Sequence, residues 1–197
     1  VPANALAVPT DALASAVPAE LTELLAAALT VYDAAGGDDW GSVRAAQAAA
    51  EAAWSAYRAG GVPPLMDDQM TRALRRLSGD HLAPAIAAEN AGGAQKGALD
   101  VAQATLDLQL RHRTPAEVDL RRLDLWSRQL VLDTAAQEPG AVHGDVTTLG
   151  WIRDRFAHTL SSTDATQVDS WLERMQSGIE NEDLQEVEDA NGELRLW

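Results

Sequence analysis

Asp154 and His158 have the spacing of a metal-ligand pair, because they lie four positions apart. On a helix this spacing places a carboxylate and an imidazole on one turn, where both can bind a divalent metal. A complete site needs a third ligand, for which His112 and His143 are candidates. Such pairs more often form an exposed hydrogen bond, so the sequence predicts no required cofactor and a divalent metal only as an alternative.

Other metal chemistry has weaker support. Met66 and Met70 lie one turn apart beside two aspartates, and thioethers prefer Cu(I), but methionines at this spacing more often fill a core. The chain has no cysteine, which excludes thiolate sites. It also lacks the paired Glu-x-x-His motifs of di-iron bundles and the His-Glu-x-x-His motif of zinc proteases.

Four charged residues are candidates for a polar pocket between helices. Asp107 and Arg111 are four positions apart, a spacing that more often gives a surface ion pair. Asp119 falls on the apolar stripe of the segment 114–133, and Asp133 lies at the edge of that stripe. Near a helix N-terminus, Asp119 is favoured by the helix dipole and is expected near solvent or paired with an arginine. For Asp133 the expected partner is an arginine of a neighbouring helix.

Catalysis has little support in the sequence. No Gly-x-Ser-x-Gly motif and no other sequence-local nucleophile motif occurs. The sequence therefore favours a binding or interaction protein. A metal-binding protein and an enzyme that uses the four polar residues remain alternatives.

The elements that must position these residues are helices. The chain is rich in alanine, shows apolar residues at helical spacing and has no useful alternation of apolar and polar residues. Connections are short, which favours antiparallel neighbours. The sequence predicts an all-α fold: a single antiparallel up-and-down bundle of about six to seven helices over residues 19–197. Residues 1–18 are expected to form a flexible segment rich in alanine and proline.

Two segments predict more specific packing. The segment 80–113 carries apolar residues on two sides, which is typical of a central helix. Its Gly93 and Gly97 have the spacing that lets another helix approach closely. In the last helix, the inward positions after Ile179 become Glu182 and Glu186. That helix is expected to shift its register, to kink near Gly178, or to extend into solvent.

The net charge of −15 argues against nucleic-acid binding, because a protein that neutralises phosphates needs a basic surface. The acids concentrate in residues 161–197, which hold ten acidic residues and two arginines. Such a run is usually a solvated face, and its specific alternative is contact with a basic protein partner. A small ligand is the other expected partner.

The sequence contains no apolar run long enough to span a membrane. The first residues are rich in alanine, proline and valine, as expected after removal of a signal peptide. We therefore expect a secreted or periplasmic protein, although the absence of cysteine fits either redox environment.

Overall fold

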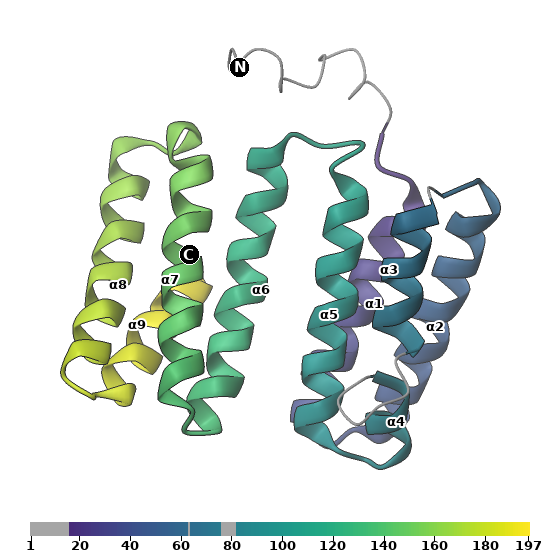
Figure 1. Ribbon diagram of the computed structural model, residues 1–197, viewed down its shortest axis with the longest axis horizontal. Helices are drawn as coiled ribbons and strands as arrows, with labels where there is room; N and C mark the ends of the chain where they lie inside the picture. The colour runs from purple at the N-terminus through teal and green to yellow at the C-terminus, as the bar shows by residue number, and fades with distance from the viewer. Residues whose placement is uncertain (1–15, 63, 76–81) are drawn as a thin grey trace. The chain divides into compact units, whose positions relative to one another are not determined.

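The structure, a computed structural model, describes residues 16–62, 64–75 and 82–197, which form α-helices and contain no strand (Figure 1). The helices are α1 Ala19–Gly36, α2 Trp40–Ala59, α3 Pro64–Arg75, α4 Leu82–Ala87, α5 Ala91–Gln109, α6 Pro115–Ala135, α7 Pro139–Phe156, a short 3-10 helix Ala157–Thr159, α8 Ser162–Glu180 and α9 Leu184–Leu196. The prediction of an all-α helical bundle is confirmed. Of the predicted flexible segment 1–18, residues 1–15 lie outside the described residues.

The contacts divide the chain into two compact units, residues 1–114 and 115–197. The sequence predicts no boundary within residues 19–197. The boundary falls where α6 begins, at Pro115, and proline suits a first helical position because its fixed φ matches the helix and the missing N–H would have no intrahelical partner.

In the first unit, α5 is the central helix. It contacts α1, α3 and α4, while α1 also packs along α2. A Cβ atom added at Gly97 would lie 2.6 Å from the backbone nitrogen of Leu82, and one at Gly93 would lie 3.0 Å from Ala85 Cβ. The two glycines therefore let α4 approach α5 closely, as their spacing predicts.

In the second unit, α6, α7 and α8 follow one another as neighbours, and α9 passes behind α7 to contact α6 and α8 (Figure 1). Large apolar side chains from all four helices form one core. Its buried members are Leu123, Leu130, Val142, Val146, Leu149, Ile152, Phe156, Val168, Trp171, Met175, Val187, Ala190 and Leu194.

Four helix ends use the same turn, in which a polar residue takes the left-handed conformation. These residues are Asp38, Glu89, Gln137 and Glu182, with φ between 51° and 57°. After each, the next backbone N–H bonds back to a carbonyl five residues earlier, as Asp183 does to Gly178 at 2.8 Å. This bond satisfies a carbonyl at the helix end. Two of these turns divide segments that were each expected as one helix, so the helices outnumber the predicted six to seven.

The last expected helix ends at Glu180, and α9 folds back onto the core. Gly178 permits this return, because an added Cβ would lie 2.8 Å from Val187 Cγ2 and 2.9 Å from the Asp183 carbonyl. The Asp183 side chain caps α9 by accepting from Gln185 and Glu186. None of the three expected outcomes for this helix occurs, because a new helix begins in a new direction.

Candidate functional site

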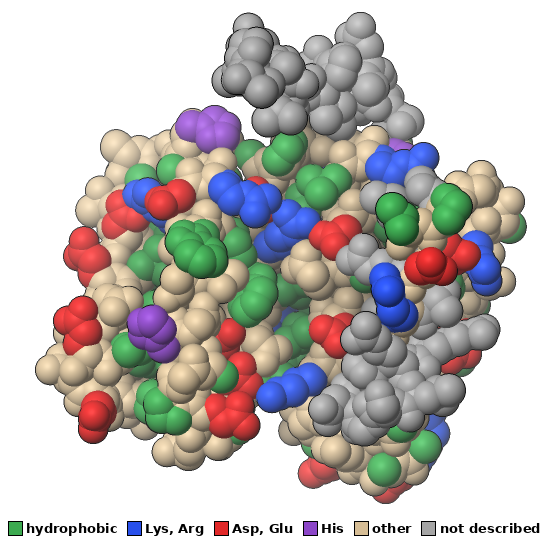
Figure 2. Space-filling view, in the orientation of Figure 1, with side chains coloured by type: hydrophobic (Ala, Val, Ile, Leu, Met, Phe, Trp, Pro, Cys, Tyr) green, Lys and Arg blue, Asp and Glu red, His purple; other side chains and the backbone are tan. Residues whose placement is uncertain are grey.

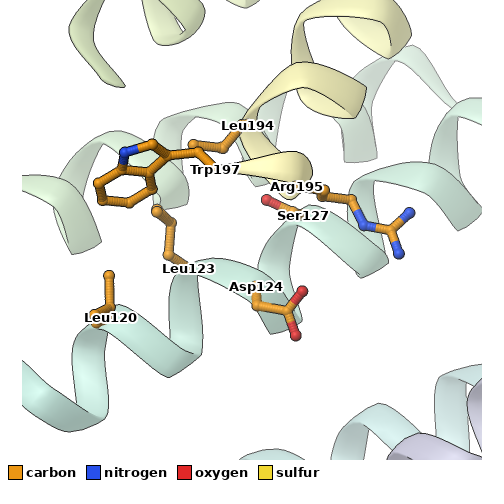
Figure 3. A pocket seen from close by; sticks show the side chains of 7 residues that line it. All are labelled: Leu120, Leu123, Asp124, Ser127, Leu194, Arg195 and Trp197. Atoms are coloured by element: carbon orange, nitrogen blue, oxygen red, sulfur yellow. The ribbon is translucent and has the colours of Figure 1, made fainter. Parts of the chain in front are cut away.

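A pocket of about 370 Å³ opens in the second unit, between α6 and the C-terminal end of α9 (Figure 3). Its volume lies in the range typical of small-molecule sites. The lining residues are Leu120, Leu123, Asp124, Ser127, Leu194, Arg195 and Trp197. We call this the α6/α9 pocket.

The helix repeat explains how α6 supplies one wall. Leu120, Leu123, Asp124 and Ser127 are three or four positions apart, so they lie on one face of α6. The opposite wall is the last turn of α9, which reaches α6 only because the chain reverses after α8. The pocket therefore depends on the α8–α9 turn.

The apolar end of the pocket combines buried and accessible groups. Leu123 and Leu194 belong to the core, whereas Leu120 and Trp197 are 45% and 46% exposed. The Trp197 ring contacts the Trp171 ring edge-on, with 6.4 Å between their centroids. This contact holds Trp197 as a wall.

At the polar end, the buried Ser127 hydroxyl has no hydrogen-bond partner among the described residues. Ser127 is 1% exposed, and its oxygen points towards the end of α9, beside Leu194 and Arg195 (Figure 3). Asn191 donates from Nδ2 to the Ser127 carbonyl at 2.8 Å, so it contacts the backbone of Ser127 and leaves the hydroxyl unused. A buried polar group without a partner destabilises the fold, so its presence needs an explanation.

The two charged residues that line the pocket differ in their surroundings. Asp124 Oδ2 accepts from Arg128 Nε at 3.1 Å, one turn along α6. Arg195 is exposed and has no ion pair within the described part of the chain. The pocket thus presents one cation whose charge is not already paired.

Beside the pocket, Arg174 of α8 binds two carboxylates of α9. Its Nε donates to Glu186 at 2.6 Å and its Nη1 to Glu193 at 2.8 Å, and Trp171 Nε1 also donates to Glu193 at 3.0 Å. The hydrogen bonds from Arg174 and then Trp171 hold the pKa of Glu193 below its ordinary value. The bonds to Glu186 and Glu193 raise the pKa of Arg174. Part of the acidic charge of α9 is therefore neutralised within the unit.

Charges are mixed on the face that Figure 2 shows. The face in Figure 2 shows acidic and basic side chains interspersed, with exposed hydrophobic side chains among them (Figure 2).

Among the predicted site residues, Asp119 forms ion pairs with two arginines. Its side chain is 1% exposed, and its Oδ1 lies 2.9 Å from Arg122 Nη1 and 2.9 Å from Arg155 Nη2 of α7. The arginine pairing is one of the two predicted alternatives, and the Asp119 carboxylate is buried although its partner Arg155 is exposed. The two ion pairs neutralise the carboxylate and join α6 to α7.

Of the other three predicted polar residues, Asp133 and Asp107 bond to a glutamine one turn earlier on the same helix, and Arg111 bonds to a residue of α2. Asp133 accepts from Gln129 Nε2 at 2.7 Å, and Asp107 accepts from Gln103 Nε2 at 3.1 Å. Arg111 donates to the Tyr57 hydroxyl at 3.4 Å. Asp107 and Arg111 belong to the first unit, Asp119 and Asp133 to the second. None of the four lines the α6/α9 pocket, and a shared site for them stays a prediction.

Arg111 does line a second, shallower hollow of about 320 Å³ in the first unit. Glu20, Tyr57 and His112 are among its other lining residues. The Arg111 guanidinium is thus accompanied by an acid.

The predicted metal pair is separated by the end of its helix. Asp154 is exposed and pairs with Arg153, with 3.1 Å between Oδ1 and Nη1. His158 lies beyond the end of α7 at Phe156, in the short 3-10 helix. Among residues 16–62, 64–75 and 82–197, no three His, Asp or Glu side chains gather as a metal site would require. The metal alternative stays a prediction.

The structure also bears on the methionine pair and on membrane-spanning helices. Met70 is fully buried, in agreement with a core role, while the side chain of Met66 lies outside the described residues. Of the described helices, none has the length and apolar character needed to cross a membrane.

Sequence reasoning did not select the residues of the α6/α9 pocket. Ser127 carried a signal, because it occurs on the buried side of α6 between Leu123 and Leu130. Arg195 and Trp197 carried none, since their place depends on how α9 turns back.

Comparisons with protein-family models, with curated proteins and with solved structures find no match to this chain.

Proposed function

We propose that this chain is a non-enzymatic binding protein that takes a small ligand into the α6/α9 pocket. One observation carries the proposal: an accessible apolar wall adjoins a buried hydroxyl that no described residue satisfies. Small-molecule sites typically combine such a wall with a few placed polar groups.

The surroundings of Ser127 support binding over catalysis. A serine nucleophile needs an adjacent base within hydrogen-bond reach. Among the described residues, no group accepts a hydrogen bond from the Ser127 hydroxyl. The hydroxyl is therefore suited to orient a ligand and is not activated to attack one.

A small ligand fits these observations better than a basic protein partner does. Two α9 carboxylates that such a partner would contact, Glu186 and Glu193, already bind Arg174. The proposal retains the predicted secreted or periplasmic location, which fractionation of the producing cells would test.

The test is a substitution that blocks the opening of the pocket. Leu120→Trp enlarges a partly exposed lining residue, so it fills the opening with little change to the core. Leu65→Trp makes the same change at a residue of α3 that is 81% exposed. Ligand-observed NMR with a library of small apolar acids, alcohols and amines identifies binders. We expect binding to the natural sequence and to Leu65→Trp, and at least a tenfold loss in Leu120→Trp. Equal binding to all three proteins, or no binder at all, would contradict the proposal.

A further inference from the structure

The polar end of the α6/α9 pocket selects among ligand charges. We propose that its ligand is a small carboxylate with an apolar body, bound by Arg195 and the Ser127 hydroxyl. This inference rests on the proposed function and adds the chemical class of the ligand.

Two ionised residues, Asp124 and Arg195, line the pocket. Asp124 is already paired with Arg128, so an amphipathic cation would have to compete with that arginine. Arg195 has no ion pair among the described residues, so a ligand anion can pair with its guanidinium without displacing another group. A guanidinium also matches the planar geometry of a carboxylate.

Ser127 is the uncharged polar residue that lines the pocket. Its buried hydroxyl can donate one hydrogen bond, and no described residue accepts it. A carboxylate oxygen at the polar end would accept that hydrogen bond, and bonds to charged groups are stronger than neutral ones. Figure 3 places the Ser127 oxygen and the Arg195 side chain on the same side of the pocket, away from the Trp197 ring.

The other lining residues favour an apolar ligand body. Leu120, Leu123, Leu194 and Trp197 offer an aliphatic and aromatic surface at the other end. Burial of apolar ligand atoms there supplies affinity. The protein as a whole carries −15 and repels anions at long range, so recognition of the carboxylate must come from contact with Arg195 and Ser127.

Titration calorimetry with three eight-carbon probes tests the inference: octanoate, 1-octanol and octylammonium share one apolar body. We expect octanoate to bind most tightly to the natural sequence. Arg195→Gln should weaken octanoate by about tenfold or more, as loss of a charge-assisted bond predicts, and leave octanol unchanged. Ser127→Ala should weaken octanoate by a few-fold. Arg72→Gln, an exposed arginine of α3, makes the same charge change in the first unit and should alter nothing.

The possible failures are distinguishable. If octanol or octylammonium binds as tightly as octanoate, or if Arg195→Gln leaves octanoate unchanged, the carboxylate inference is overturned and the binding proposal stands. If none of the probes binds and the library screen also fails, both are contradicted. Sedimentation at the same concentrations checks another occupant: a dimer that Leu120→Trp dissociates would show that a second copy covers the pocket, and would overturn the inference.

Discussion

The helices before Thr114 and those after it bury different kinds of side chain. In the described part of residues 1–114, many buried side chains are alanines, and no buried carboxylate occurs. In residues 115–197, Ala190 is the only alanine in the buried apolar set, and three carboxylates are buried: Asp119, Asp133 and Asp145. The first unit packs small side chains, whereas the second encloses polar groups within a core of large ones.

This difference indicates where function lies. Small side chains let helices approach closely, as α4 does at Gly97. Buried polar groups destabilise a fold unless they have partners, so an unsatisfied one points to a role beyond packing. The second unit holds both the unpaired Ser127 hydroxyl and the α6/α9 pocket. We therefore propose that the binding role belongs to the second unit.

The largest expected effect tests the close packing of the first unit. Gly97→Ala should lower the free energy of unfolding by about 3 kcal/mol, because the new methyl meets the Leu82 backbone, which cannot move aside as a side chain can. In Gly178→Ala the new methyl meets Val187 and the Asp183 carbonyl in the second unit. The free energy of unfolding should fall by less than in Gly97→Ala, since the Val187 methyl can shift. Gly150→Ala, with open space around it, should raise the free energy of unfolding by about 0.5–1 kcal/mol. Urea unfolding measures all three, and a neutral Gly97→Ala would refute the packing account.

The next largest effect is the stability lost when an ion pair is broken, which should be greater for a buried pair of the second unit than for an exposed pair of the first. Asp119→Asn should cost about 2 kcal/mol, because it removes the charge that Arg122 and Arg155 share, with a discount for the exposure of Arg155. Glu89→Gln breaks the exposed pair of Glu89 with Arg44 and should cost under about 0.5 kcal/mol. Equal losses in the two variants, measured by urea unfolding, would show that burial does not distinguish the units.

A smaller effect of opposite sign tests the unsatisfied hydroxyl. Ser127→Ala should raise the free energy of unfolding by about 1 kcal/mol, because it removes a buried polar group that has no partner among the described residues. Thr105→Val in the first unit removes a buried hydroxyl that donates to the Val101 carbonyl at 2.7 Å, and it should destabilise. Thermal melts would compare the two variants. A loss of stability in Ser127→Ala would mean that the hydroxyl is satisfied in solution.

The smallest expected effect is on the loss of stability at low pH. Each unit has a carboxylate whose pKa is lowered, Asp39 in the first and Glu193 in the second. Hydrogen bonds from the Ser42 side chain and backbone hold the pKa of Asp39 below its ordinary value, as Arg174 and Trp171 do for Glu193. A lowered folded-state pKa stabilises the fold above the ordinary pKa of about 4, and this stability is lost as the pH falls through the folded-state pKa.

Asp39→Asn and Glu193→Gln should therefore each flatten the decline of stability below about pH 4. Carboxyl NMR titration gives the two pKa values, and thermal melts against pH give the decline. Variants whose decline matches that of the natural sequence would show that neither carboxylate contributes.

Much of the fold could be predicted from helical spacing and helix signals. Proline at position 115 marks the start of α6, and the two apolar faces of α5 identify a helix with several neighbours. Gly93 and Gly97 correctly predicted a close helix contact. Asp119 lies on an apolar stripe of the sequence, and the arginine pair expected for it is present, whereas its burial at 1% exposure was not predicted.

The missed turns have a physical reason. A helix most often ends in a left-handed residue that is glycine, which has no Cβ to clash. Here Glu89 and Glu182 take that conformation, so the sequence carries no glycine signal at either turn. Without the turn at Glu182, the return of α9 and the α6/α9 pocket cannot be predicted.

The most direct test of the account is a two-dimensional amide NMR titration of the full chain with octanoate. We predict that the shifts concentrate at Leu120 to Ser127 and Leu194 to Trp197, while the first unit stays unchanged. Shifts that concentrate around Tyr57 and Arg111 would place the binding site in the first unit and contradict the assignment of function to the second.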